Sequence, residues 1–149
     1  MQREARLFIA MIAQFDKLIK AQEQKLSLCE QHIVRYNNDI AAKQSQVNGL
    51  ISQIAQMSLP KAGDFSVLLQ ANAKKRAFVF EIDSLQEQIA KDKARIQELE
   101  REYRLLCIEF EKLKHIREIE RENLIKTLKQ KERRELDEVA ILLHRKELL

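Results

Sequence analysis

The chain has little of what turns a backbone or ends a helix. Its 149 residues include two glycines, one proline and no tryptophan. Because a compact globular domain needs many turns, and turns are rich in glycine and proline, this scarcity argues against a globule. Charged residues make up 34% of the chain. The composition therefore predicts an elongated helical protein whose core is a line along the helix axis.

The residue types that serve catalysis and metal binding are scarce or scattered. The three histidines, His32, His115 and His144, are far apart and form no pair at the helical spacing of metal ligands. Two glycines are too few for a phosphate-binding loop. The many glutamates lie on solvated helix faces, where nothing excludes water for acid–base chemistry. We expect no catalytic residues, no metal, no cofactor and no enzymatic activity.

Charge and hydropathy exclude two further classes of partner. The 27 basic residues face 23 acidic ones, with alternating signs and no interleaved aromatic residues. This pattern argues against nucleic-acid binding. The apolar stretch of residues 7–15 is too short to span a bilayer, so we expect no direct membrane insertion.

Apolar residues recur in steps of 4 and 3 along two stretches, which is the mark of a coiled coil. The first stretch consists of Phe8, Ile12, Phe15, Ile19, Gln22, Leu26, Cys29, Ile33, Tyr36, Ile40, Lys43, Val47, Leu50, Ile54 and Met57. The second consists of Phe78, Ile82, Leu85, Ile89, Asp92, Ile96, Leu99, Tyr103, Leu106, Phe110 and Leu113. Polar residues at three of these positions, Gln22, Lys43 and Asp92, are expected to specify the register of the pairing.

The break between the two stretches predicts a single turn at residues 58–64. Pro60 ends the preceding helix, Gly63 supplies a permissive backbone and Asp64 can cap the next helix. We therefore predict one elongated all-α domain over residues 1–149, with helices over about 2–57 and about 65–147. Because the connection is short, the two helices should form an antiparallel coiled-coil hairpin.

A turn near residue 61 predicts a register in which opposed residue numbers add up to about 122, so that Phe8 lies beside residue 114. This register offsets Cys29 from Cys107 by about 20 Å along the axis, which excludes a disulfide. Reduced thiols are typical of a cytoplasmic protein.

In this register the second helix overhangs the first by roughly 30 residues, or about 45 Å. The 4–3 series would continue at Arg117 and Glu120, and it fails at both. The overhang carries a basic block followed by an acidic block with a small apolar stripe, which together favour binding to a partner. Its candidate contact residues are Arg121, Lys126, Lys129, Lys131, Arg133, Arg134, Leu136, Asp137, Glu138, Val139 and Ala140.

The length, the two long helices and the charged stretch of residues 105–131 resemble the FliJ family of flagellar type III export stalk proteins and its injectisome counterparts of the YscO type. Residues 131–140, Lys-Glu-Arg-Arg-Glu-Leu-Asp-Glu-Val-Ala, are similar to the C-terminal signature of that family. The likeness spans most of the chain.

The resemblance implies a non-enzymatic central stalk that inserts its tip into a hexameric export ATPase and couples it to the export gate. It also implies handling of export chaperones and a cytoplasmic location, peripheral to the inner membrane through partners. The family's contact with the cytoplasmic portion of the export gate maps to Phe78 and Ile82. The free protein is expected to be a monomer.

Two alternatives remain open. The first is a coiled-coil scaffold or tether that dimerises through the overhang, and a stable homodimer in sedimentation would favour it. The second is a prefoldin-like chaperone subunit, which needs β-hairpins where the helices join. The sequence offers no convincing pair of strands there.

Overall fold

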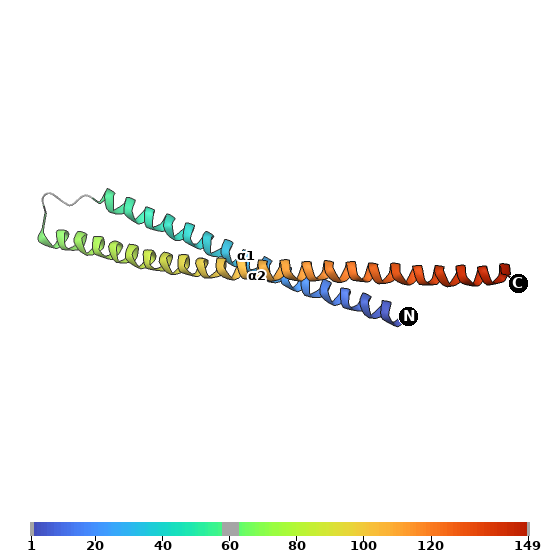
Figure 1. Cartoon of the computed structure of the whole chain (residues 1–149). Coiled ribbons are helices and arrows are strands. Elements are labelled where there is room, and N and C mark those ends of the chain that lie inside the picture. Colours follow the sequence, from blue (N-terminus) through green and yellow to red (C-terminus); the bar gives the residue numbers. More distant parts are fainter. Residues whose placement is uncertain (1, 58–62, 149) are drawn as a thin grey trace. The chain divides into compact units, whose positions relative to one another are not determined.

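The computed structural model describes residues 2–57 and 63–148, and it consists of two helices. Helix α1 spans Gln2–Gln56 and helix α2 spans Phe65–Leu148, with 55 and 84 residues (Figure 1). Within these ranges no residue is in a strand. The predicted all-α class is confirmed, and the helix boundaries differ from the predicted ones by no more than one residue.

The helix ends beside the turn follow the expected chemistry. At the end of α1, the Met57 N–H donates to the carbonyls of Gln53 and Ile54, at 3.1 Å each. At the start of α2, the Asp64 carbonyl accepts from the N–H of Val67 at 3.0 Å, so Asp64 occupies the N-cap position as predicted. Pro60 lies outside the described residues. Gly63 does not adopt the positive φ that only glycine tolerates well.

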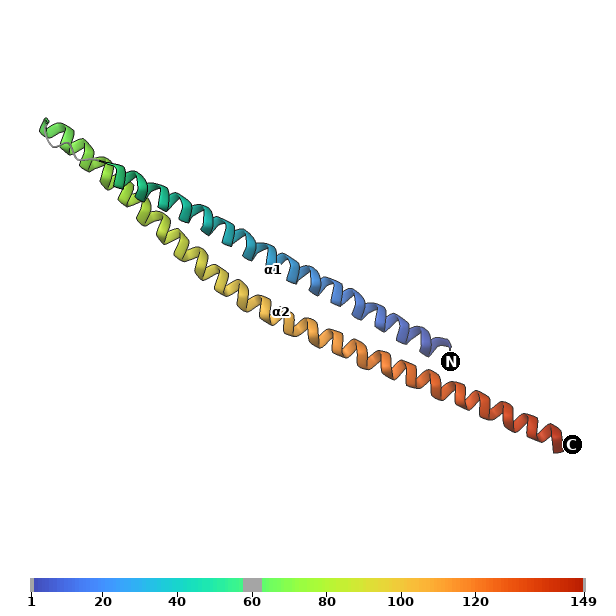
Figure 2. The same ribbon diagram turned by 90° about the horizontal axis from the view of Figure 1, so that it is seen from above.

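The chain forms two compact units. The first, here called the turn unit, comprises residues 27–104, and the second, the terminal unit, comprises residues 1–26 and 105–149. Both units pair a segment of α1 with an antiparallel segment of α2 (Figures 1 and 2). The fold is therefore the predicted helical hairpin.

The predicted heptad positions form the seam, which is the row of side chains between the two helices. All of them, from Phe8 to Met57 and from Phe78 to Leu113, are buried or half-buried. The most buried apolar members are Ile19, Cys29, Val47, Ile89, Ile96 and Leu99. Because a two-helix seam has no second layer, most of its positions keep some contact with solvent.

The predicted register of the turn unit is wrong. Contacts across its seam join Lys43 to Asp92, and Cys29 to the carbonyl of Leu99 at 3.3 Å. The opposed segment of α2 therefore lies roughly ten residues further along the chain than predicted. The prediction assumed that both helices end at the same level beside the turn. Instead, the first turns of α2, up to about residue 75, extend past the end of α1.

The polar seam residues explain this register. The Lys43 ammonium and the Asp92 carboxylate lie 2.7 Å apart, with side chains 26% and 15% exposed. In the terminal unit, the buried Gln22 amide donates to Glu109 at 3.0 Å and to the carbonyl of Leu106 at 3.4 Å. Since a shift of either helix would leave these groups unpaired in the seam, they act as register keys.

The terminal unit shows the same displacement. Arg117 donates to Asp16 at 3.1 Å, and Thr127 lies level with Glu4 and Phe8. Although the apolar series ends at Leu113, the 4–3 positions Arg117, Glu120, Leu124 and Lys131 remain half-buried. The seam thus continues in polar form, and the expected failure at Arg117 and Glu120 is a change of residue type, not of geometry. The overhang is correspondingly shorter than predicted and comprises residues 132–148.

Both cysteines carry reduced thiols, as expected. Cys29 is buried in the seam and Cys107 is half-buried. The predicted axial offset of about 20 Å between them is wrong, because it rested on the wrong register.

The Lys43–Asp92 pair predicts strong non-additivity in stability. Lys43→Leu would leave the Asp92 carboxylate unpaired in the seam and should lower the free energy of unfolding by about 1–3 kcal/mol. Lys43→Leu combined with Asp92→Leu should recover most of that loss, because two apolar residues suit the seam. Urea unfolding followed by circular dichroism measures both. Equal losses in the single and the double variant would show that the pair does not set the register.

Gly49 offers a second test of the fold. It lies inside α1, and a Cβ added there would meet nothing within 4 Å. Gly49→Ala should therefore raise the free energy of unfolding by about 0.5–1 kcal/mol, since alanine loses less backbone entropy in a helix. A destabilised variant would mean that the helix is not continuous at this position.

Candidate functional site

The last part of α2 is exposed to solvent along its whole length, because no segment of α1 covers it. Every residue from 132 to 148, here called the free end, is exposed. The segment nevertheless remains helical to Leu148. Large apolar side chains are among its exposed residues: Leu136, Val139, Ile141, Leu142, Leu143 and Leu148. Exposed apolar side chains at this density indicate a surface that binds a partner.

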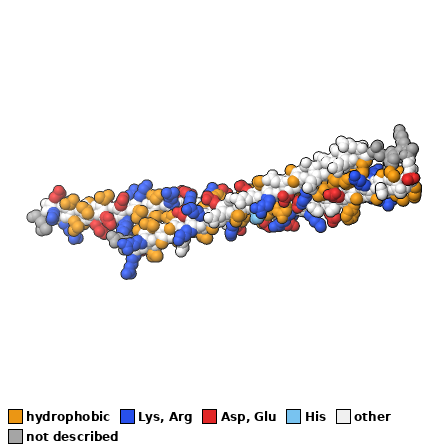
Figure 3. Space-filling model, turned by 180° about the vertical axis from the view of Figure 1, so that it is seen from behind, with side chains coloured by type: hydrophobic (Ala, Val, Ile, Leu, Met, Phe, Trp, Pro, Cys, Tyr) orange, Lys and Arg blue, Asp and Glu red, His pale blue; other side chains and the backbone are white. Residues whose placement is uncertain are grey.

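The charges of this region are arranged in sequence blocks. Residues 121–134 hold six basic and two acidic residues, whereas residues 135–138 hold three acidic residues and no basic one. A shallow groove on α2 is lined by Lys126, Lys129, Gln130, Glu132, Arg133 and Leu136. Figure 3 shows basic, acidic and apolar side chains side by side towards this end of the molecule. The surface therefore offers both apolar and ionic contacts.

The structure divides the predicted contact residues into two groups. Arg121, Lys126 and Lys129 lie in the part of α2 that runs beside α1, and Lys131 is half-buried at the edge of the seam. Arg121 also lies 4.0 Å from Glu118 on its own helix. The remaining candidates, from Arg133 to Ala140, lie on the free end.

Arg117 is a half-buried charged residue in the seam of the terminal unit. Its guanidinium reaches Asp16 at 3.1 Å and Glu118 at 3.8 Å, while its Nε is buried and has no hydrogen-bond partner within the described part of the chain. Sequence reasoning treated this position as the end of the seam. The signal that could have identified its role was its place in the 4–3 series.

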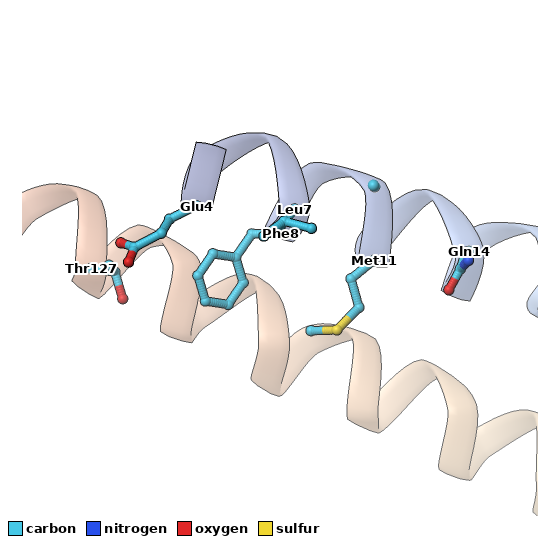
Figure 4. Close-up of a pocket in the computed structure, with 7 residues that line it drawn as sticks. Glu4, Leu7, Phe8, Met11, Gln14 and Thr127 are labelled. Carbon is cyan, nitrogen blue, oxygen red and sulfur yellow. The ribbon is translucent and has the colours of Figure 1, made fainter. Parts of the chain in front are cut away.

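An apolar groove near the start of α1 was also missed. It lies between the two helices of the terminal unit, and it is lined by Glu4, Leu7, Phe8, Ala10, Met11, Gln14 and Thr127. Figure 4 shows Phe8 and Met11 directed from α1 towards α2, and Glu4 beside Thr127. Only part of the apolar stretch of residues 7–15 belongs to the seam, and Leu7 is 70% exposed because it lies off the seam.

The two candidates for gate contact lie in the turn unit. Phe78 and Ile82 are half-buried seam residues, and the Lys74 ammonium lies 6.0 Å from the Phe78 ring centroid. Their neighbour Phe80 is 77% exposed, and Phe65 near the start of α2 is 73% exposed. The exposed aromatic residues at this end were not predicted, because only seam positions were considered.

Two further observations concern metal binding and membrane spanning. Among residues 2–57 and 63–148, no cluster of three or more histidine, cysteine or acidic side chains is arranged to hold a metal ion. Over the same residues, neither helix has a stretch apolar enough to cross a membrane.

Comparison with known proteins agrees with the architecture. The model of the flagellar FliJ protein family matches residues 6–148. Neither the curated proteins nor the solved structures gave a match. Because the family match covers essentially the whole hairpin, including the free end, the chain belongs to the FliJ family and is a component of the flagellar export apparatus.

Proposed function

We propose that this protein is the central stalk of the export ATPase. In this proposal the end of the hairpin that contains both termini enters the centre of a hexameric ATPase, and the protein couples ATP turnover to the export gate. The observation that carries the proposal is the free end of α2, which stays helical while all of its residues are exposed.

The dimensions and chemistry of the free end suit such a partner. A single helix is about 10–12 Å across with its side chains, and residues 132–148 extend it by about 25 Å. Its mixture of basic, acidic and apolar side chains would give a ring of identical subunits several kinds of contact. Residues Arg121 to Ala140 are the proposed contact segment, with Arg133 to Ala140 the most accessible part.

The proposed gate contact uses Phe78 and Ile82 in the turn unit. Both are half-buried, so a partner reaches them fully only if the seam opens locally. The register favours such opening, because Phe78 lies close to the level at which α1 ends. Exposed Phe80 would then give the gate a first apolar contact that requires no opening.

The remaining parts of the proposal concern the cellular setting. The protein acts as a single elongated domain in the cytoplasm and is held at the inner membrane through its partners. It also handles export chaperones, for which the exposed apolar side chains of the hairpin supply contact surface. When free at low micromolar concentration it is a monomer.

Deleting residues 132–149 tests the stalk proposal. The deletion removes the free end and no seam position, so we expect unchanged helicity per residue and an unchanged unfolding midpoint. Stimulation of the export ATPase should be lost, or fall by at least about tenfold, because the contact side chains are gone. Steady-state ATP hydrolysis with the purified ATPase measures this.

A charge variant in the turn unit serves as the control for this deletion. Lys91→Glu together with Lys93→Glu changes two exposed residues of the turn unit, outside the proposed contact segment. This variant should stimulate the ATPase normally. Full stimulation by the deletion variant would refute the proposal.

A further inference from the structure

One face of α2 near its end carries an exposed apolar stripe. The stripe consists of Ile125, Leu128, Leu136, Val139 and Leu143, and these side chains are between 42% and 68% exposed. At 100° per residue they fall within about 80° of the helix circumference. Glu132, which is exposed, occupies the one charged position in the stripe. The stripe lies to one side of the seam, so α1 does not cover it.

The stripe is symmetric about residue 134. Ile125 and Leu143 lie nine residues on either side of this point, and Glu132 and Leu136 lie two residues on either side. Leu128 lies six residues before it, and Val139 and Ala140 lie five and six residues after it. When two such helices pair antiparallel with their centres at residue 134, Ile125 of one copy meets Leu143 of the other, and Leu136 meets Glu132. Leu128 lies within one residue of the level of Val139, so these two side chains also meet across the contact.

The net charge of the helix changes sign at the same point, residue 134. Residues 121–134 carry a net charge of +4, and residues 135–148 carry a net charge of −2. Antiparallel pairing places Lys131 of one copy on the same flank of the contact as Glu135 of the other, and Arg133 on the same flank as Asp137. Parallel pairing would instead place basic on basic and acidic on acidic residues, which is unfavourable. The charge pattern therefore favours a second copy of the chain as the partner, and it favours antiparallel pairing over parallel pairing.

We infer that the stripe binds a second copy of this chain in the antiparallel direction, with the two-fold axis passing near residue 134. Complete burial of the five apolar side chains in both copies would remove about 1,000 Å² from water, which is at the lower limit for specific interfaces. Two copies of Glu132 also lie in the contact. The dimer should therefore be weak, with a Kd on the order of tens of micromolar, unlike the stable dimer of a scaffold protein.

This dimer would regulate the site described above, and that part of the inference rests on the proposed function. The self-contact covers Arg133, Leu136 and Val139, which are also proposed ATPase contacts. A chain in the dimer cannot offer these residues to the ATPase, so the two complexes exclude each other. Self-association would keep the apolar stripe covered while no ATPase is available.

Sedimentation of the full chain from about 1 μM to about 300 μM tests the dimer. We expect a monomer at the lowest concentration and a growing dimer fraction above tens of micromolar. Leu136→Glu should raise the Kd by at least about tenfold, because it places a charge in the centre of the stripe. Ile141→Glu is the matched control. Ile141 is 57% exposed on the same segment but lies off the stripe, and its substitution should leave the Kd unchanged.

A second variant should strengthen the contact. Glu132→Leu completes the apolar stripe and should lower the Kd by at least about tenfold, whereas Glu138→Leu, on another face, should not. A wild-type chain that stays monomeric throughout, with no dimer in the Glu132→Leu variant, would overturn the inference. Equal effects of the stripe and control variants would overturn it as well.

Disulfide formation between introduced cysteines tests whether the two helices of the dimer pair in the antiparallel direction. In a chain with Cys29 and Cys107 replaced by alanine, Glu132→Cys and Leu136→Cys are introduced in separate chains and mixed under oxidation. An antiparallel dimer should give mainly mixed disulfides between positions 132 and 136. Mainly self-linked chains of one variant would indicate parallel pairing and overturn the inference.

ATPase stimulation separates failure of the dimer from failure of the stalk. A chain that stimulates the ATPase and never dimerises refutes the inference and leaves the stalk intact. A chain that dimerises as described and does not stimulate the ATPase refutes the stalk, and with it the mutual exclusion, while the self-contact stands.

Discussion

The register of the seam is the constraint on which the rest of this structure depends. A two-helix seam made of apolar residues alone could slide by a heptad at little cost, because each position meets a similar partner. The polar residues remove that freedom. Lys43 pairs with Asp92 at 2.7 Å and Gln22 with Glu109 at 3.0 Å. By fixing which residues lie opposite each other, these contacts also determine how much of α2 has α1 beside it.

The part of α2 that has α1 beside it differs from the free end in how much of its surface is covered. Where α1 is alongside, the 4–3 positions up to Leu124 are buried or half-buried, including the polar positions Arg117 and Glu120. From residue 132 to residue 148 every side chain is exposed. A helix without a partner keeps its shape through intrahelical pairs and propensity, and its apolar residues are left for contacts with other molecules. The family match makes the chain a component of the flagellar export apparatus.

Most of the fold could be predicted from the sequence. Heptad spacing identified the seam positions up to Met57 and Leu113, but not the polar continuation at Arg117 and Glu120. The scarcity of glycine and proline located the one turn. The register could not be predicted, because hydrophobic spacing repeats every seven residues and many alignments satisfy it equally well. Lys43 and Asp92 were recognised as polar seam residues, but not as partners of each other. The groove at Phe8 and Met11 and the exposure of Phe80 also depend on register and on rotation about the helix axis.

We propose that the export ATPase binds the free end of α2. Hydrogen exchange of the full chain, with and without the hexameric ATPase, tests it most directly. The amides of residues 132–148 exchange fast in a solitary helix and should become protected in the complex, more than those of the seam. Protection confined to other parts of the hairpin, with unchanged exchange at residues 132–148, would contradict the account.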